Sequence, residues 1–349
     1  MNQHPWPLPW QRYARPLPQP WKHALFVFIA ALLLLGSGSL LLCRPAAVEA
    51  AVQPMEKASS ETFSAVLPDC ITTALPSGAA THAMVYPEAR LLAGRMMLID
   101  ESHPFPDDAA PPNTFNLLAA SHGSIACRDT QATLQPDALA ALQQLFYAAR
   151  LSYINTLTVF RGSISPLQQK NLQVERFCAL ANTFPLTDAL AQVLAQIPSP
   201  GASEHQTGWA VDIRLCDGWN QLPRSQLLSA SPEGQWLLNN CWRFGFIHRY
   251  PESAPHSDPA CGSYHFRYVG RAHAAMMHAL GLTLEDYLTL LHTQPVLTLW
   301  DDAGNPCCTV LCKKAAPDLL LQVPDGALLD DASLDHLGWG IAAYLWPAD

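Results

Sequence analysis

The sequence predicts an α+β fold in which helices surround a small antiparallel sheet. Apolar residues recur at three- and four-residue spacing in some segments, as in an amphipathic helix, and alternate with polar residues in others, as in a strand. Segments of both kinds follow one another along the middle of the chain, with Pro- and Gly-containing stretches between them. The expected helices span 136–153, 172–196, 232–241 and 272–291, and the expected strands span 157–160, 209–213, 244–247 and 264–269.

The composition limits the class of protein. Of the 349 residues, 49% are hydrophobic and 14% charged, which suits a globular core together with a membrane segment. The formal net charge of −9 argues against nucleic acid as a partner. The chain has ten cysteines, nine of them at or beyond Cys70. We therefore expect disulfides in an oxidising compartment, with buried thiols as the alternative.

The N-terminal region is expected to tether the chain to a membrane. Residues 1–23 contain basic but no acidic residues, and residues 24–43 are almost uninterruptedly apolar, about the length that a membrane-spanning helix needs. The basic flank predicts a cytoplasmic N-terminus and an exported domain at a bacterial cell membrane, with a cleaved signal peptide as the alternative. Residues 44–94, rich in Ala, Pro, Ser and Thr, are expected to be a mobile spacer before a main domain at 95–292.

Residues 203–213 contain a pair of candidate metal ligands. His205 and Asp212, seven positions apart, offer an imidazole and a carboxylate, which suit Zn²⁺. Gly208 between them permits a sharp turn, and the alternation after it indicates a strand that points Asp212 back towards His205. A third ligand must come from elsewhere, and His265 supplies it from another strand-like segment.

Local signals place the neighbouring elements. Pro136 suits a helix start, and Ser231 suits the N-cap of the helix 232–241. The strand 157–160 ends at Arg161, whose guanidinium can hold a carboxylate through two hydrogen bonds or polarise a carbonyl group. The alternative is that Arg161 only caps a loop.

Two sequence patterns resemble one enzyme family. Ser-x-His-x-x-Gly-x-Ala-x-Asp at 203–212 and Tyr-His-Phe-Arg-Tyr-Val-Gly at 264–270 are similar to motifs of the VanY-type D-alanyl-D-alanine carboxypeptidases. These zinc peptidases trim bacterial cell-wall peptides and share their metal centre with lysostaphin-type peptidases and hedgehog domains. The resemblance covers roughly residues 95–290. It implies a zinc ion on His205, Asp212 and His265, and a peptidoglycan stem peptide ending in D-Ala-D-Ala as substrate.

The resemblance also implies roles for residues around the metal. The family has an Arg beside the zinc that grips the substrate, and Arg161 matches it. Ser203 would form a hydrogen bond with the substrate near the metal. Gln168 and Tyr264 are further candidates for binding the substrate, although the turn before Gln168 is longer than in the family.

The sequence departs from the family at the general base. The family places a Glu three residues before the last zinc-binding His, where this chain has Gly262. One interpretation is an active enzyme in which Glu252, Asp258 or the neighbouring Glu204 substitutes for that Glu. A second is a zinc-containing module that binds cell-wall peptides without cleaving them, and a third is a fold in which the metal is only structural. A peptidase for another peptidoglycan bond, such as L-Ala-D-Glu, is a further alternative.

Residues 293–349 are expected to form a small β-rich appendage. Alternating segments around Val296–Trp300 and Thr309–Cys312 suggest a hairpin. Cys307, Cys308 and Cys312 lack a fourth ligand at zinc-finger spacing, so disulfides are expected there in preference to a metal.

Overall fold

A computed structural model describes residues 67–105, 112–217, 220–221, 228–251, 263–316 and 318–347. Among these residues, Gln173–Val193 belong to one compact unit, and the described residues before 173 and after 193 belong to another. The expected leader 1–23 and membrane helix 24–43 lie outside the described residues, as do Glu252, Asp258 and Gly262.

The expectation of a single-pass membrane protein is corrected by the helices that the structure describes. The longest of them has 16 residues, and a helix needs about 20 apolar residues to cross a bilayer. Within the described ranges, no helix is both long enough and apolar enough to do so. The predicted localisation as a single-pass membrane protein is therefore not supported by the described residues.

The predicted small antiparallel sheet is confirmed. It has the order β5 (Leu157–Arg161), β6 (Ala210–Asp217), β9 (His265–Tyr268) and β8 (Phe246–His248), with β7 (Asn220–Gln221) paired to β6. The register sets Asp212 of β6 directly opposite His265 of β9 on one side and Arg161 of β5 on the other. Three predicted site residues therefore meet across neighbouring strands.

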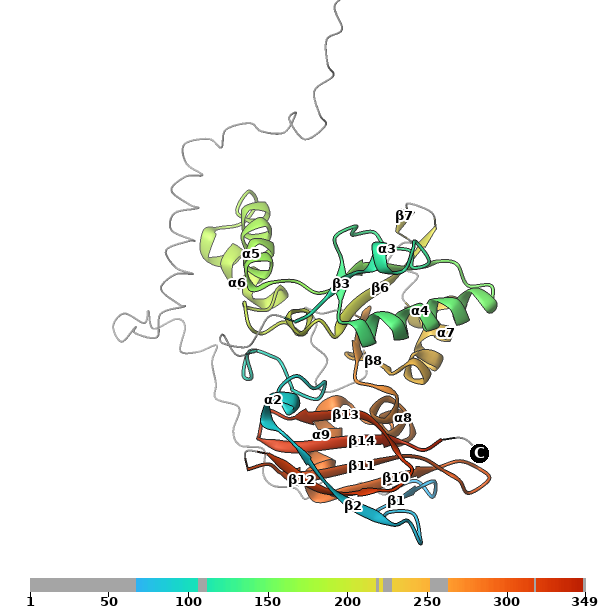
Figure 1. The fold of residues 1–349 in the computed structure, drawn as a ribbon. Coiled ribbons are helices and arrows are strands. Elements are labelled where there is room, and N and C mark those ends of the chain that lie inside the picture. Colours follow the sequence, from blue (N-terminus) through green and yellow to red (C-terminus); the bar gives the residue numbers. More distant parts are fainter. Residues whose placement is uncertain are drawn as a thin grey trace, which may run out of the picture. The chain divides into compact units, whose positions relative to one another are not determined.

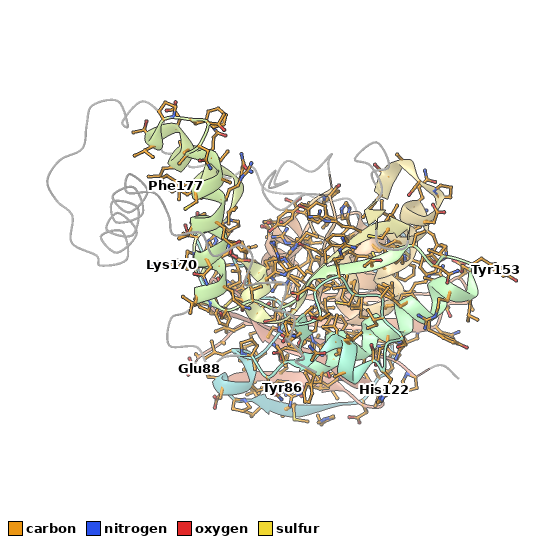
Figure 2. All side chains as sticks on the ribbon, turned by 90° about the horizontal axis from the view of Figure 1, so that it is seen from above. Tyr86, Glu88, His122, Tyr153, Lys170 and Phe177 are labelled. Carbon is orange, nitrogen blue, oxygen red and sulfur yellow. The ribbon has the colours of Figure 1, made fainter. Side chains whose placement is uncertain are left out.

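Helices pack against this sheet, largely as their periodicity predicts (Figure 1). Helix α4 (Pro136–Leu151) begins with Pro136 in its first turn and buries Leu142 and Leu145 completely. Just beyond it, Tyr153 adopts a positive φ of 61° and points into solvent, 93% exposed (Figure 2). The predicted cap of α7 (Pro232–Asn240) is confirmed, since Ser231 Oγ accepts a hydrogen bond from the Gly234 N–H.

Two segments expected as single helices are each interrupted. The segment 172–196 comprises parts of α5 (Pro166–Leu180) and α6 (Leu186–Gln196). Pro185 lies between the two helices, and proline disfavours the helical conformation of the residue before it. The segment 272–291 comprises α8 (Arg271–Leu280) and α9 (Leu284–Thr293). Gly281 ends α8 at a φ of 65°, and the Thr283 side chain caps α9.

The C-terminal residues form strands that share a core with α8 and α9 (Figure 1). A five-stranded antiparallel sheet has the order β1 (Ile71–Thr72), β10 (Val296–Trp300), β11 (Pro306–Lys314), β14 (Trp339–Leu345) and β13 (Leu328–Leu334). A separate ribbon pairs β12 (Leu319–Pro324) with β2 (Thr81–Tyr86). Residues 67–94, which we assigned to a mobile spacer, thus contribute two strands and α2 (Glu88–Leu91), because their backbone groups pair with the C-terminal strands.

The remaining described elements are short. They are β3 (Phe115–Asn116), α3 (Leu117–Ala120), β4 (Thr133–Leu134), and the 3₁₀ turns η2 (Glu204–Thr207), η3 (Leu228–Ala230) and η4 (Cys241–Phe244). In the first compact unit, α5 and α6 contact each other through Phe177, Leu180, Ala189 and Val193.

The predicted disulfides are absent among the eight described cysteines, all of which are free. Cys216, Cys241, Cys308 and Cys312 are buried. Burial raises the pKa of the Cys241 thiol to about 12, and does the same for Cys308 and Cys312. These side chains pack as small apolar groups, which was the alternative interpretation.

His273 of α8 provides a pH-dependent contribution to stability. It is fully buried, with Nδ1 3.0 Å from the Tyr287 hydroxyl and Nε2 3.7 Å from Asp331 Oδ2; Asp330 and Arg95 also act on it. Burial lowers the pKa of His273 to about 4. His273 takes up a proton near pH 6.5 in the unfolded chain but only near pH 4 in the folded chain. Its contribution to stability is therefore fully present above about pH 6.5 and declines as the pH falls to about 4.

We expect the free energy of unfolding to fall by on the order of 3 kcal/mol across that interval. In a His273→Gln variant, urea titrations at several pH values should give a markedly flatter dependence. His122→Asn, in an exposed loop (Figure 2), is the control and should keep the wild-type pH dependence. An unchanged profile in His273→Gln would contradict the assignment.

Candidate metal centre

The turn predicted at Gly208 creates the geometry of the site. Residues Glu204–Thr207 form the 3₁₀ turn η2, which ends at Gly208 with a φ of 74°. A Cβ atom there would lie 2.8 Å from Gln135 Cγ, so both the backbone conformation and the space require glycine. The chain then enters β6, which carries Asp212 back beside His205 as the sequence predicted.

Three buried side chains converge at this point. Asp212 Oδ1 lies 3.2 Å from His205 Nε2 and 3.0 Å from His265 Nδ1. One donor atom from each of the three residues lies within 4.8 Å of the others, and each residue is at most 5% exposed. Two imidazole nitrogens and one carboxylate oxygen at this spacing fit Zn²⁺, whose ligand distances are about 2.0–2.2 Å. Among the described residues, these three are the His, Cys, Asp or Glu side chains whose donor atoms lie close enough together to hold one metal ion.

Hydrogen bonds fix the orientation of both imidazoles. His205 Nδ1 donates to the carbonyl oxygen of Gly162 at 2.7 Å, which leaves Nε2 to face Asp212. A Cβ on Gly162 would lie 2.4 Å from the Thr133 carbonyl oxygen, so glycine is also needed there. His265 Nε2 lies 3.1 Å from Glu204 Oε2, which leaves Nδ1 to face Asp212. Partners of this kind orient metal-binding histidines.

The charges around Asp212 keep its carboxylate ionised. Burial acts to raise the pKa of Asp212, but His205 and His265 outweigh burial and hold that pKa well below its usual range. Burial lowers the pKa of His205, as do His265 and Arg161. Burial also acts to lower the pKa of His265, yet hydrogen bonds to Asp212 and Glu204 raise it to about 9. Asp212 is therefore available as an anionic ligand at neutral pH.

Arg161, Ser203 and Tyr264 were also predicted from the sequence to lie around this centre. Arg161 is half-buried at the end of β5, opposite Asp212, and close enough to affect the pKa of His205. Ser203 is buried immediately before η2. The Tyr264 ring packs against the Arg214 guanidinium, whose carbon lies 3.8 Å from the ring centroid.

Gln168 has a structural partner. Its Oε1 accepts a hydrogen bond from the Ser165 N–H at 2.7 Å, and its own N–H donates to Ser165 Oγ at 3.2 Å. This reciprocal pair is a capping box at the start of α5. The Ser-x-x-Gln spacing at 165–168 carried that signal in the sequence.

Several residues beside the site escaped the sequence analysis. Glu204 was considered only as a substitute base, yet its carboxylate accepts hydrogen bonds from Arg249 Nε at 2.9 Å and Arg267 Nη1 at 2.7 Å. The Tyr250 ring stacks on His265 with centroids 5.5 Å apart. Arg267 could have been found from strand alternation, since it lies two positions after His265 and so shares its face. The partners of Glu204 and Tyr250 depend on long-range contacts.

Part of the chain is similar to known proteins. Residues 131–271 match the family described as VanY, D-alanyl-D-alanine carboxypeptidase. A D-alanyl-D-alanine carboxypeptidase from Enterococcus faecalis is 34% identical over 149 residues, which is 42% of this chain. The chain spans 52% of that relative's length, and 30% and 32% of the length of two further curated relatives.

Among solved structures, one shares the fold, and a second is more similar in sequence. The vancomycin-resistance D,D-dipeptidase VanXYg, solved with a D-Ala-D-Ala phosphinate analogue, is 17% identical with a TM-score of 0.59, covering 76% of this chain and 99% of that one. A VanY D,D-pentapeptidase from the VanB-type cassette, solved with Zn(II), is 28% identical with a TM-score of 0.43, covering 56% of this chain and 98% of that one. The matched segment 131–271 contains His205, Asp212 and His265. This segment of the chain is therefore similar to the VanY family of D-alanyl-D-alanine carboxypeptidases.

Proposed function

We propose that this protein is a zinc-dependent peptidase of the D-alanyl-D-alanine carboxypeptidase type, acting on peptidoglycan stem peptides that end in D-Ala-D-Ala. The observation that carries this proposal is the convergence of His205, Asp212 and His265, whose donor atoms lie within 4.8 Å of one another. The match of residues 131–271 to the VanY family supports the choice of substrate.

The donor set favours zinc over other metals. Two imidazoles and one carboxylate form a three-ligand site of the kind that catalytic zinc centres use, with a further position for water or substrate. A zinc ion bound there would supply Lewis-acid chemistry, activating water and polarising the scissile carbonyl. The chain's contribution is to hold the three ligands in place through Gly162, Glu204 and the pairing of β6 with β9.

Arg161 and Ser203 are the proposed substrate contacts nearest to the metal. Arg161 is fixed by the β5–β6 pairing opposite Asp212, where a guanidinium can hold a terminal carboxylate or polarise the peptide carbonyl. Ser203 would donate a hydrogen bond to the bound peptide. Tyr264 and Gln168 remain proposed contacts at the rim, although their side chains already have the partners described above.

The proton transfers need a base other than the family's Glu, whose position is Gly262. Glu204 is unsuited, because Arg249, Arg267 and His265 occupy its carboxylate. We propose that Glu252 or Asp258, in the segment that leads to His265, takes the proton from the attacking water and returns it to the leaving amine.

A second candidate function is a zinc-containing module that binds cell-wall peptides with impaired catalysis. The glycine at position 262, together with the engagement of Glu204 by two arginines, favours this alternative. The two functions share the metal centre and differ only in turnover.

Zinc should stabilise the folded protein by binding the three ligands. Adding zinc to chelator-treated full-length protein should raise its Tm, because a ligand that binds only the folded state stabilises it. His205→Ala, Asp212→Ala and His265→Ala should each abolish this rise, whereas His82→Ala, an exposed histidine of β2, should preserve it. A full zinc-dependent rise in Tm in any of the three ligand variants would refute the ligand set.

The substrate assignment predicts release of free D-alanine. Full-length protein with zinc should release D-alanine from a pentapeptide ending in D-Ala-D-Ala, and chelator should stop the release. Arg161→Lys should lower kcat/KM by about 10²–10³-fold, because one ammonium group cannot reproduce the guanidinium fork. Arg150→Lys, at the exposed end of α4, is the matched control. Equal activity of Arg161→Lys and wild type would remove Arg161 from the site.

The base assignment separates the two candidate functions. If the protein is active, either Glu252→Gln or Asp258→Asn should lower kcat by about 10²–10⁴-fold while leaving zinc affinity unchanged. Glu233→Gln on α7 is the control. Absence of turnover in the wild type, together with chelator-sensitive binding to purified peptidoglycan, would instead establish the binding module.

A further inference from the structure

The geometry points to Glu204 as the residue that positions the metal ligand His265, fixing its tautomer so that Nδ1 is offered to the metal. This inference rests on the proposed zinc centre and gives Glu204 a role other than that of a base.

The contacts of the Glu204 carboxylate carry the argument. Oε2 lies 3.1 Å from His265 Nε2, while Oε1 accepts hydrogen bonds from Arg249 Nε at 2.9 Å and from Arg267 Nη1 at 2.7 Å. The residue is 3% exposed. Since a carboxylate held by two arginines accepts hydrogen bonds and has no proton to donate, His265 must carry a proton on Nε2. Its Nδ1 is then the atom left for the metal.

The imidazole of His205 carries its proton on the other ring nitrogen. His205 donates from Nδ1 to the Gly162 carbonyl oxygen and presents Nε2 to the site. Glu204 and His205 are neighbours in η2. The same short turn therefore provides one ligand and the group that orients another.

The arginines hold Glu204 in place in turn. Arg249 forms a forked pair with Glu285 of α9 at 2.6 and 3.0 Å, so the buried cluster contains two carboxylates and two guanidinium groups. Arg267 Nη2 donates to the carbonyl oxygens of Arg95 and Met97, both at 2.7 Å. A charge-balanced cluster that is hydrogen-bonded on several sides restricts the carboxylate to one position.

The C-terminal sheet supports this arrangement. Ser333 Oγ of β13 accepts hydrogen bonds from the Arg95 N–H at 2.7 Å and from the Met96 N–H at 3.2 Å. Residues 95–97 thus connect β13 to Arg267, and Arg267 connects them to Glu204. The positioning of His265 consequently depends on strands beyond residue 292 as well as on the VanY-like segment.

Direct observation of the histidine tautomers tests the inference without a mutation. In ¹⁵N-histidine-labelled, zinc-loaded full-length protein, long-range ¹H–¹⁵N NMR should show His265 protonated at Nε2 and His205 protonated at Nδ1. Protonation of His265 at Nδ1, with the metal on Nε2, would overturn the proposal.

A substitution tests the same point by affinity. Glu204→Gln should weaken zinc binding by about 10- to 100-fold in competition with a chromophoric chelator, since loss of such orienting partners has effects of this size. The matched control is Asp335→Asn, which removes another buried carboxylate paired to a histidine, His292 at 2.6 Å, away from the metal. It should lower Tm without changing zinc affinity.

Equal zinc affinity of Glu204→Gln and wild type would refute the positioning role, and should Glu204→Gln not fold, the tautomer measurement decides. Neither readout requires turnover. A protein that binds zinc as described but releases no D-alanine would contradict the proposed function while leaving this inference standing.

Discussion

The pairing of β6 with β9 is the constraint on which the site depends. It sets Asp212 directly opposite His265, and the left-handed turn at Gly208 brings His205 to the same point. Because side chains alternate along a strand, a slip of one residue in this register would turn either Asp212 or His265 to the opposite face. On the opposite face of the sheet, Val211, Ile213 and Phe266 are buried in one hydrophobic core, and their packing opposes such a slip. Packing on one face of the sheet thus keeps Asp212 and His265 together on the other face.

Charge balance is the second requirement, since several ionisable groups are buried around the candidate ligands. Burial acts to raise the pKa of Glu204, but Arg267 and Arg249 outweigh it and hold that pKa well below its usual range. Removing one partner would leave an uncompensated buried charge, which strongly destabilises a protein. The arginines are held by Glu285 and by the backbone of residues 95–97. The site is therefore maintained by parts of the chain that contribute none of the three candidate ligands.

The sequence predicted those features that local chemistry determines. The turn at Gly208, the cap at Ser231 and the small antiparallel sheet all have short-range signals, and the three candidate ligands lie in recognisable motifs. Features that depend on distant contacts were missed. Nothing local shows that β2 pairs with β12, that Glu204 reaches Arg249, or that the cysteines remain free thiols. The capping box at Ser165 and Gln168 was visible in the sequence, but the resemblance favoured a substrate role for Gln168.

The central claim is that one zinc ion binds between His205 Nε2, Asp212 Oδ1 and His265 Nδ1. The most direct measurement is a crystal structure of the zinc-loaded full-length protein with anomalous diffraction recorded on both sides of the zinc absorption edge. The account predicts one strong anomalous peak about 2.0–2.2 Å from each of these three atoms. A peak bound by other residues, or no peak between these three side chains in zinc-saturated crystals, would contradict it.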